Sequence, residues 1–311
     1  MPSLSERLRA AEPGLCFYGL APPKRTTPPE RLAAIASAQL ARLAGLKPDG
    51  LVVYDLQDEP GRGHGPRPFP FLPTLEPEQY AYGALAPATV PRIVYRSVAA
   101  LSREAFVEWL RAENARPLEP FAVLVGAPST LTPGALSLDE AYALAREHAP
   151  RLQLGGVAIA ERHARKGDEH LRLMKKQEAG CRFFVTQTVY DASATRSLIS
   201  DYARATRKAG LAPAPLIFTF SPCGSSKTLE LLKWLGVGVP RWLENELLDA
   251  HDILGTSLEL SRATFADVLG YAHTHRLPVG ANVESVAIRK EEIDASVSLF
   301  HALRSELAKA R

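Results

Sequence analysis

The sequence predicts a single (βα)8 barrel, a TIM barrel of parallel strands with a C-terminal closing helix, over residues 1–311. Eight short apolar or β-branched runs alternate with longer segments of helical periodicity, which is typical of repeated βα units. Most of these runs are apolar on both alternating faces, as the strands of a buried parallel sheet must be. No GxGxxG motif follows the first run, whereas a doubly wound sheet usually carries one there. These observations favour one closed barrel over two ordinary domains.

The predicted strands are apolar runs that supply the eight parallel strands of a closed barrel. They span 15–20 (LCFYGL), 51–56 (LVVYDL), 92–98 (RIVYRSV), 121–127 (FAVLVGA), 154–161 (LGGVAIAE), 182–189 (RFFVTQTV), 215–221 (PLIFTFS) and 279–285 (VGANVES).

The predicted helices lie between these strands and repeat apolar residues at three-to-four spacing. Several begin with Ser or Asp, or end in Gly, which are common helix boundary residues. They span 30–45, 102–115, 137–149, 168–180, 192–210, 226–236 and 258–275. A final helical segment, 291–311, is expected to close the ring of helices.

The composition is that of an ordinary globular protein, because 46% of the residues are hydrophobic and 23% are charged. A net charge of +3 with scattered basic residues gives no argument for a nucleic-acid or membrane partner. Cys16, Cys181 and Cys223 are too far apart for a disulfide framework, and the N-terminus lacks a signal-peptide pattern. We therefore expect a soluble, cytoplasmic protein.

Candidate site residues lie at the carboxyl ends of the predicted strands, where barrel enzymes keep their chemistry. They are Asp55, Gln57, Asp58 and Glu59 after the second strand, Glu161, Arg162 and His163 after the fifth, Thr186 and Gln187 in the sixth, and Asn282 and Glu284 in the eighth. The long Pro- and Gly-rich stretch 57–79 is interpreted either as a binding lid or as a plain surface insertion.

Gln187 is the most informative of these residues, because an unpaired amide inside a strand destabilises the core by roughly 1–3 kcal/mol. Either a bound heterocycle satisfies it or a side chain of a neighbouring strand does. For His163, beside Glu161, a ligand contact and a solvated loop position are equally open.

No metal site is expected, since His273 and His275 lie two apart on a helix and face different directions. The stretch 221–228 (SPCGSSKT) is interpreted mainly as a helix cap through one of its serines, with anion binding as the alternative. Cys223 is expected to be structural, because the sequence assigns it no base.

Several segments match one family in order along nearly the whole chain. The strongest is 179–191 (AGCRFFVTQTVYD), preceded by the basic helix LRLMKKQEAG and followed by LIFTFSP at 216–222 and VPRWL at 239–243. At the N-terminus, CFYGLAPPK at 16–24 completes the pattern. With these segments the chain resembles the catalytic barrel of methylenetetrahydrofolate reductases.

The resemblance implies an oxidoreductase of one-carbon metabolism and methionine biosynthesis. In that family a hydride passes from NAD(P)H, through non-covalent FAD, to a folate-bound methylene group. Matched position by position, the resemblance assigns Gln187, Tyr190 and Glu284 to the folate substrate, and His163, Glu169, Arg172, Lys175 and Lys176 to the flavin.

The chain departs from the family where the family keeps its acids. The catalytic Glu aligns with Gly19, an Asp beside the flavin aligns with Ala127, and two substrate contacts align with Thr228 and Leu232. A reduction of this type needs a proton source, usually a carboxylic acid with a raised pKa. Our hypothesis assigns that catalytic role to Asp55, Asp58 and Glu59.

Three functional interpretations remain. The first is a reductase with a displaced acid and with FAD or a directly bound nicotinamide. The second is a folate- or flavin-binding barrel without the standard reaction, acting in a demethylation pathway or as a partner subunit. The third, an aldolase-like lyase with a Schiff-base lysine, is disfavoured because no lysine lies within a predicted strand. The choice between NADH and NADPH and the formation of a homo-oligomer stay open.

Overall fold

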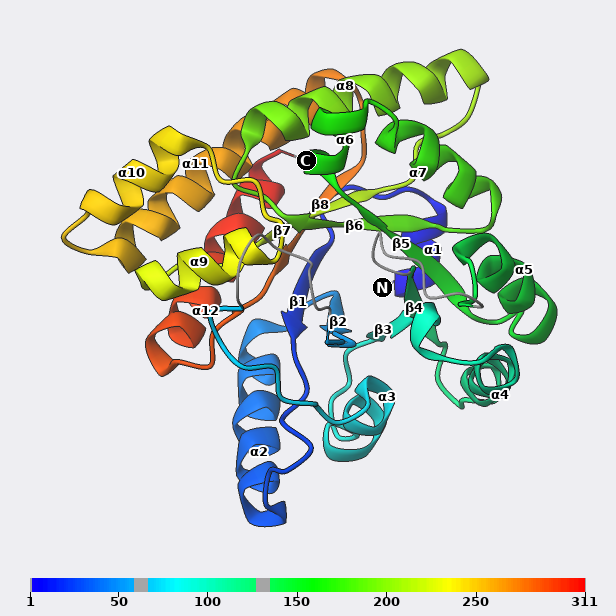
Figure 1. The fold of residues 1–311 in the computed structure, drawn as a ribbon. Coiled ribbons are helices and arrows are strands. Elements are labelled where there is room, and N and C mark those ends of the chain that lie inside the picture. The colour runs from blue at the N-terminus through cyan, green and yellow to red at the C-terminus, as the bar shows by residue number, and fades with distance from the viewer. Residues whose placement is uncertain (1, 59–66, 127–134, 311) are drawn as a thin grey trace.

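A computed structural model describes residues 2–58, 67–126 and 135–310 of the chain. Its eight strands form a closed ring in sequence order, with every neighbouring pair parallel and β8 pairing back to β1 (Figure 1). The strands are β1 Cys16–Leu20, β2 Gly50–Val53, β3 Arg92–Ser97, β4 Phe121–Val125, β5 Gln153–Ala158, β6 Phe183–Thr188, β7 Leu216–Phe220 and β8 Val279–Val283. The predicted barrel is confirmed, and each strand falls within or beside its predicted run.

Helices surround the strands as an outer layer, which Figure 1 shows around the ring. They are α1 Leu4–Arg9, α2 Pro29–Leu46, α3 Pro77–Gln79 continued by the π-helix Tyr80–Ala84, the 3-10 turn Val98–Ala100, α4 Arg103–Asn114, α5 Leu138–His148, α6 Ala160–Lys166, α7 Glu169–Glu178, α8 Ala192–Ala209, α9 Ser226–Trp234, α10 Arg241–Asp249, α11 Ile253–Thr274 and α12 Lys290–Lys309. None of the described helices is both long and apolar enough to cross a membrane.

The interior of the barrel is filled by alternate strand residues, so it is a packed core and not a channel. Its buried members are Leu15, Phe17, Val52, Ile93, Tyr95, Phe121, Val123, Phe183, Val185 and Ile217, joined at the amino ends of the strands by Leu4 and Leu8 of α1. Gly155 of β5 is required there, because a Cβ would lie 2.5 Å from the Phe183 ring. The opposite faces of the strands pack against the outer helices.

Some strands end earlier than their apolar runs predict. The predicted fifth strand ran to residue 161, but β5 ends at Ala158 and Ala160 begins α6. The run is apolar across this boundary, so hydrophobicity alone does not mark it. In the second and eighth strands, residues 54–56 and 284–285 also lie beyond the strand ends and reach the rim of the barrel.

Candidate functional site

The barrel mouth is the rim formed by the carboxyl ends of the strands, and its polar layer comes from β2, β7 and β8. The Asn282 amide donates to the Tyr54 hydroxyl at 2.9 Å and to Thr219 Oγ1 at 3.2 Å. The Tyr54 ring meets Tyr95 edge-to-face, with centroids 4.8 Å apart. Two tyrosines and an amide therefore cover the apolar core below them.

Glu284, just beyond β8, carries the carboxyl of this layer. Thr188 Oγ1 donates to its Oε1 at 3.4 Å, and the Tyr54 hydroxyl also hydrogen-bonds to the carboxyl. Burial raises the pKa of Glu284 to about 6, although the two hydroxyls act in the opposite direction. A carboxyl of this kind is still partly protonated near neutral pH, which suits it to donate a proton.

Gly19 of β1 lies directly beside Glu284, across the seam where β1 pairs with β8. A Cβ at Gly19 would lie 2.9 Å from Tyr54 Cε2 and 3.2 Å from Glu284 Cβ. A larger side chain has no room at position 19, because Tyr54 and Glu284 fill the space. The position that the sequence resemblance aligns with the reductases' catalytic Glu is thus adjacent to a carboxyl that follows another strand.

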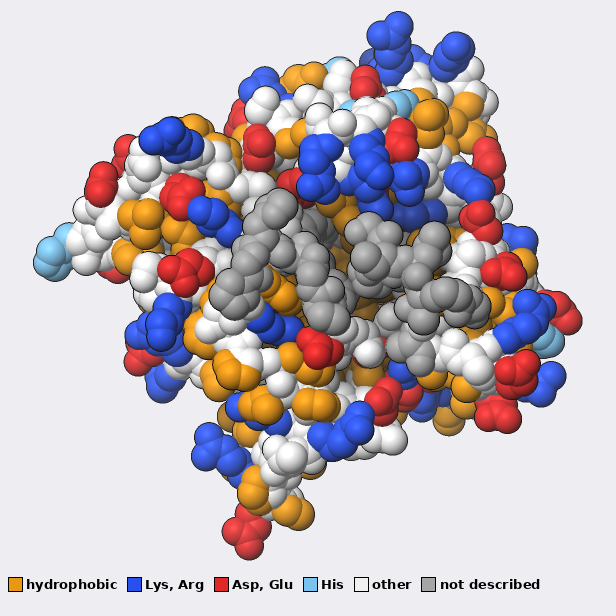
Figure 2. Space-filling view, viewed as in Figure 1, with side chains coloured by type: hydrophobic (Ala, Val, Ile, Leu, Met, Phe, Trp, Pro, Cys, Tyr) orange, Lys and Arg blue, Asp and Glu red, His pale blue; other side chains and the backbone are white. Residues whose placement is uncertain are grey.

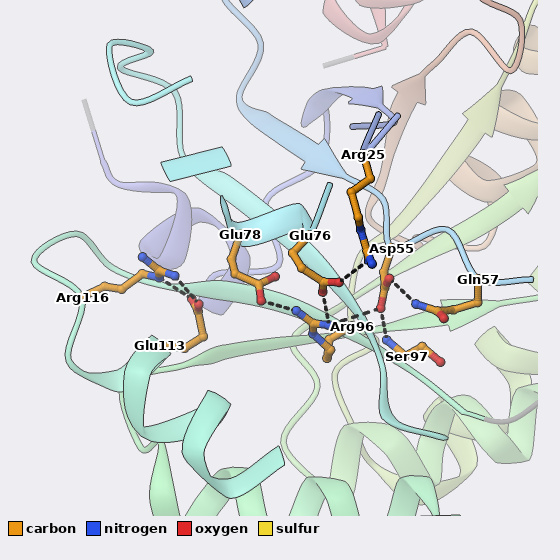
Figure 3. A network of polar contacts seen from close by, with 9 residues as sticks. All are labelled: Arg25, Asp55, Gln57, Glu76, Glu78, Arg96, Ser97, Glu113 and Arg116. Atoms are coloured by element: carbon orange, nitrogen blue, oxygen red, sulfur yellow. Dashed lines mark hydrogen bonds and ion pairs between the residues drawn. The ribbon is translucent and has the colours of Figure 1, made fainter. Parts of the chain in front are cut away.

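Asp55, predicted to be catalytic, belongs to a network on the other side of β2 and β3 (Figure 3). Its carboxylate accepts hydrogen bonds from Ser97 N at 2.8 Å and Gln57 Nε2 at 2.6 Å, and it lies 3.7 Å from Arg96 Nη1. The side chains of Asp55 and Arg96 are only 5% and 4% exposed. Strand alternation directs Tyr54 to the core and Asp55 away from it. Of the other two predicted acids, Asp58 is exposed and Glu59 lies outside the described residues.

Arg96 is the centre of this network, since it also pairs with Glu76 at 3.1 Å and with Glu78 (Figure 3). Glu76 directly precedes α3 and Glu78 lies within it. This short helix ends the long stretch predicted as a lid or an insertion. One buried guanidinium therefore ties the end of that stretch to β2 and β3.

The described part of the long stretch contacts two other elements near the mouth. The Arg67 guanidinium lies 4.8 Å from the Trp234 ring centroid of α9 and 5.1 Å from that of Phe71. Thr74 forms an isolated antiparallel bridge with Lys24, which follows β1. These contacts place the described part of the stretch against the barrel, while residues 59–66 lie outside the described part of the chain.

Gln187 lies in a bulge of β6, where the register with β7 shifts between Val185 and Thr188. Its amide donates to the backbone carbonyl of Leu235, at the end of α9, at 3.0 Å. The neighbouring Thr188 reaches Glu284 instead. A bulge redirects side chains in this way and is common beside active sites. The partner of the amide is a backbone carbonyl, not the neighbouring-strand side chain considered from sequence.

Tyr190, assigned to the substrate by the resemblance, is buried in a hydrophobic cluster with residues of α9 and α10. Its hydroxyl donates to the carbonyl of Ser221 at 2.8 Å. The expected helix cap is confirmed, because Ser225 accepts from Thr228 N at the start of α9. Cys223 is buried, and burial raises its pKa to about 11, which agrees with a structural role.

Two of the residues that the resemblance assigns to a flavin, Glu169 and Lys176, already form hydrogen bonds within the protein. Glu169 is fully buried; Arg162 contacts both carboxylate oxygens, at 2.6 and 3.0 Å, and Ile159 N donates at 3.1 Å. Lys176 donates to the carbonyl of Val157 at 2.5 Å, and burial lowers its pKa. These contacts fasten α6 and α7 to the end of β5.

The remaining flavin-assigned residues lie on the outer surface or between helices. Arg172 pairs with Asp168 at 3.1 Å, and Lys175 pairs with Asp139 at 2.5 Å. His163 points toward α8, where its Nε2 lies 3.1 Å from Asp201 Oδ2. Figure 2 shows Lys and Arg side chains gathered over α6 and α7 near the mouth, and the exposed members there include Arg165, Lys166, Arg172 and Lys175.

Comparison with known proteins finds matches among solved structures. No protein-family model and no curated protein matches the chain. An uncharacterized protein from Clostridium thermocellum that binds two copies of 5-methyl-5,6,7,8-tetrahydrofolic acid is 38% identical, with a TM-score of 0.87 over 97% of this chain and 99% of that one. A GH113 β-1,4-mannanase is 11% identical, with a TM-score of 0.55 over 96% of this chain and 99% of that one.

The two matches carry different weight. At 11% identity the mannanase shows only that the fold is shared. The 38% identical protein covers the barrel from end to end. The likeness to methylenetetrahydrofolate reductases stays a prediction from sequence motifs. The chain belongs to the same family of (βα)8 barrels as the folate-binding protein of Clostridium thermocellum.

Proposed function

We propose that this chain binds a reduced folate of the 5-methyltetrahydrofolate type at its barrel mouth. The observation that carries the proposal is its 38% identity, over 97% of its length, to a barrel that binds 5-methyl-5,6,7,8-tetrahydrofolic acid. The second functional interpretation, a folate-binding barrel without the standard flavin reaction, is therefore the one we favour.

The chemistry of the mouth supports this ligand class. The bicyclic head of a folate presents hydrogen-bond donors and acceptors on the edge of a flat ring. Glu284 offers a carboxyl that changes charge near pH 6, and the paired rings of Tyr54 and Tyr95 offer an aromatic surface. Below them, Asn282 Oδ1 is buried without a hydrogen-bond partner among the described residues. A ligand donor, directly or through a water molecule, would satisfy that oxygen.

A resident flavin fits these residues poorly. Glu169 already binds Arg162 through both oxygens, and the buried Lys176 already donates to Val157. Releasing either buried group to a ribose or a phosphate would break the hydrogen bonds that it now makes, at roughly 1–3 kcal/mol for each buried partner left unsatisfied. We therefore propose folate binding without tightly held FAD.

Reduction of a folate-bound methylene group is the second candidate, and the raised pKa of Glu284 favours it. In this version Glu284 supplies the proton that the residue aligned with Gly19 supplies in the reductases, and the Tyr54 hydroxyl orients the carboxyl. A nicotinamide, when bound, supplies the hydride. Both candidates use the same mouth, so they differ in turnover and not in location.

The experiment that tests the proposal is calorimetric titration of the purified protein with 5-methyltetrahydrofolate. We expect saturable binding that Glu284→Gln weakens by about tenfold or more, as for loss of one charged hydrogen bond. Glu178→Gln, an exposed change on α7, is the matched control and should bind like the wild type. Absence of folate binding by the wild type would refute the proposal.

Two further measurements separate the candidates. A flavin absorbance band in the purified protein would contradict binding without FAD. Oxidation of NADH or NADPH that depends on methylenetetrahydrofolate, and that Glu284→Gln abolishes, would establish the reductase version. Folate binding without such oxidation would establish the non-reductase version.

A further inference from the structure

Three helices outside the mouth bring two histidines and an aspartate together. His163 lies on α6, His170 on α7 and Asp201 on α8. One nitrogen from each ring and one carboxylate oxygen all lie within 4.8 Å of one another. His163 Nε2 is 3.1 Å from Asp201 Oδ2, and the two imidazoles meet edge-to-face with centroids 5.4 Å apart.

The hydrogen bonding of these imidazoles is incomplete. His163 is 4% exposed, and its Nδ1 is buried without a partner among the described residues. His170 Nδ1 is buried and unpartnered in the same way. A simple His163–Asp201 ion pair accounts for one ring nitrogen but leaves these two unexplained. Buried polar atoms are usually satisfied, so these two nitrogens mark the cluster as one whose hydrogen bonding is incomplete.

Asp201 gives the cluster one negative charge, while basic side chains are exposed on the outer faces of α6 and α7. Asp201 contacts His163, and no Lys or Arg of the described residues lies within ion-pair distance of its carboxylate. The carboxylate is 48% exposed, and Asp201 lines an open cavity of about 640 Å³ between α8, α10 and α11. The carboxylate of Asp201 is therefore open to solvent, whereas neither histidine lines that cavity.

We propose that His163, His170 and Asp201 form a binding site for a divalent transition-metal ion, with Zn²⁺ as the best fit. Two imidazole nitrogens and one carboxylate oxygen are a common ligand set for this ion, and water completes the coordination. Ligand atoms around a tetrahedral Zn²⁺ lie roughly 3.3 Å apart, given bonds of about 2.0–2.1 Å. The ligand atoms now lie within 4.8 Å of one another, so binding would draw the partly exposed His170 and Asp201 closer to His163.

The site has a structural consequence that is independent of folate binding. α6 and α7 are consecutive, whereas α8 follows the next strand, so the ion would link the helices around β6 from outside the barrel. Because a metal that binds only the folded chain stabilises it, Zn²⁺ should raise the midpoint of thermal unfolding.

The test is equilibrium dialysis of the chelator-treated full chain against Zn²⁺, with metal analysis of the protein. We expect one equivalent of Zn²⁺, binding at least about tenfold weaker in His170→Gln and in Asp201→Asn, and a higher unfolding midpoint for the loaded wild type. His273→Gln, an exposed histidine of α11, is the control and should bind like the wild type. Circular dichroism of each variant confirms that it is folded.

Cobalt provides an independent readout, since Co²⁺ bound to nitrogen and oxygen ligands gives a visible spectrum. We expect that spectrum in the wild type and in His273→Gln, and its loss in both ligand variants. No stoichiometric Zn²⁺ in the wild type, or unchanged binding in either ligand variant, overturns the proposal. Neither result bears on folate titration, so the two proposals fail separately.

Discussion

Glu284→Gln removes a carboxyl that the fold holds with a pKa of about 6, compared with an ordinary value of 4.5. This difference corresponds to about 2 kcal/mol of unfolding free energy. Because the folded state favours the protonated form, the wild type has this stabilisation below about pH 4.5 and loses it as the pH rises through about 6. Gln resembles the protonated form at every pH. The variant should therefore match the wild type in acid and exceed its stability by up to about 2 kcal/mol in mild alkali.

Urea unfolding followed by tryptophan fluorescence, at a series of pH values, measures this difference. Equal slopes against urea concentration in both proteins show that only stability has changed. The exposed Glu178→Gln on α7 is the control, and its effect should not follow the pH dependence of the Glu284 variant. A stability difference between Glu284→Gln and the wild type that stays constant with pH, or that grows in acid, would refute the argument from burial.

Three more changes test the remaining assignments. Asp55→Ala removes a buried partner of Arg96 and should lower the unfolding free energy by roughly 1–3 kcal/mol in denaturant melts, while the folded variant keeps its folate affinity; a large loss of affinity would restore Asp55 to the site. Gly19→Ala introduces a methyl group 2.9 Å from the Tyr54 ring, so it should lower the unfolding free energy by about 1–3 kcal/mol and weaken folate binding in calorimetric titration. Unchanged affinity would argue that the ligand does not contact Tyr54. Tyr190→Phe loses one hydrogen bond to a backbone carbonyl and should lower stability by about 1 kcal/mol with folate affinity intact; weaker binding would support the role that the resemblance assigns to Tyr190.

The strands were predictable because their apolar pattern is a direct requirement of a sheet buried on both faces. The same two-residue alternation also indicates which side chains at the end of β2 face the core. Continued from Val52, which faces the core, it directs Tyr54 to the mouth and Asp55 away from it. Its carboxylate made Asp55 the candidate from sequence, whereas in the structure it is Tyr54 that faces the barrel mouth.

Other parts of the site were beyond the reach of pattern analysis. The bulge in β6 redirects Gln187 and Thr188, and no glycine or proline in the segment marks it. The cluster of His163, His170 and Asp201 joins three helices through tertiary packing, so no ligand spacing exists in the sequence. Contacts of this kind depend on how the helices pack and not on local propensity.

The seam between β1 and β8 has a consequence for how such barrels diverge. Gly19 and Glu284 stand near opposite ends of the sequence, yet the closed ring makes them neighbours. A carboxyl can therefore be lost from one strand and gained on the adjacent one while its position in space hardly moves. Descendants related in this way keep a similar chemical environment but share no motif around the acid. In ring-shaped folds, equivalent groups are better sought by position around the rim than by alignment along the chain.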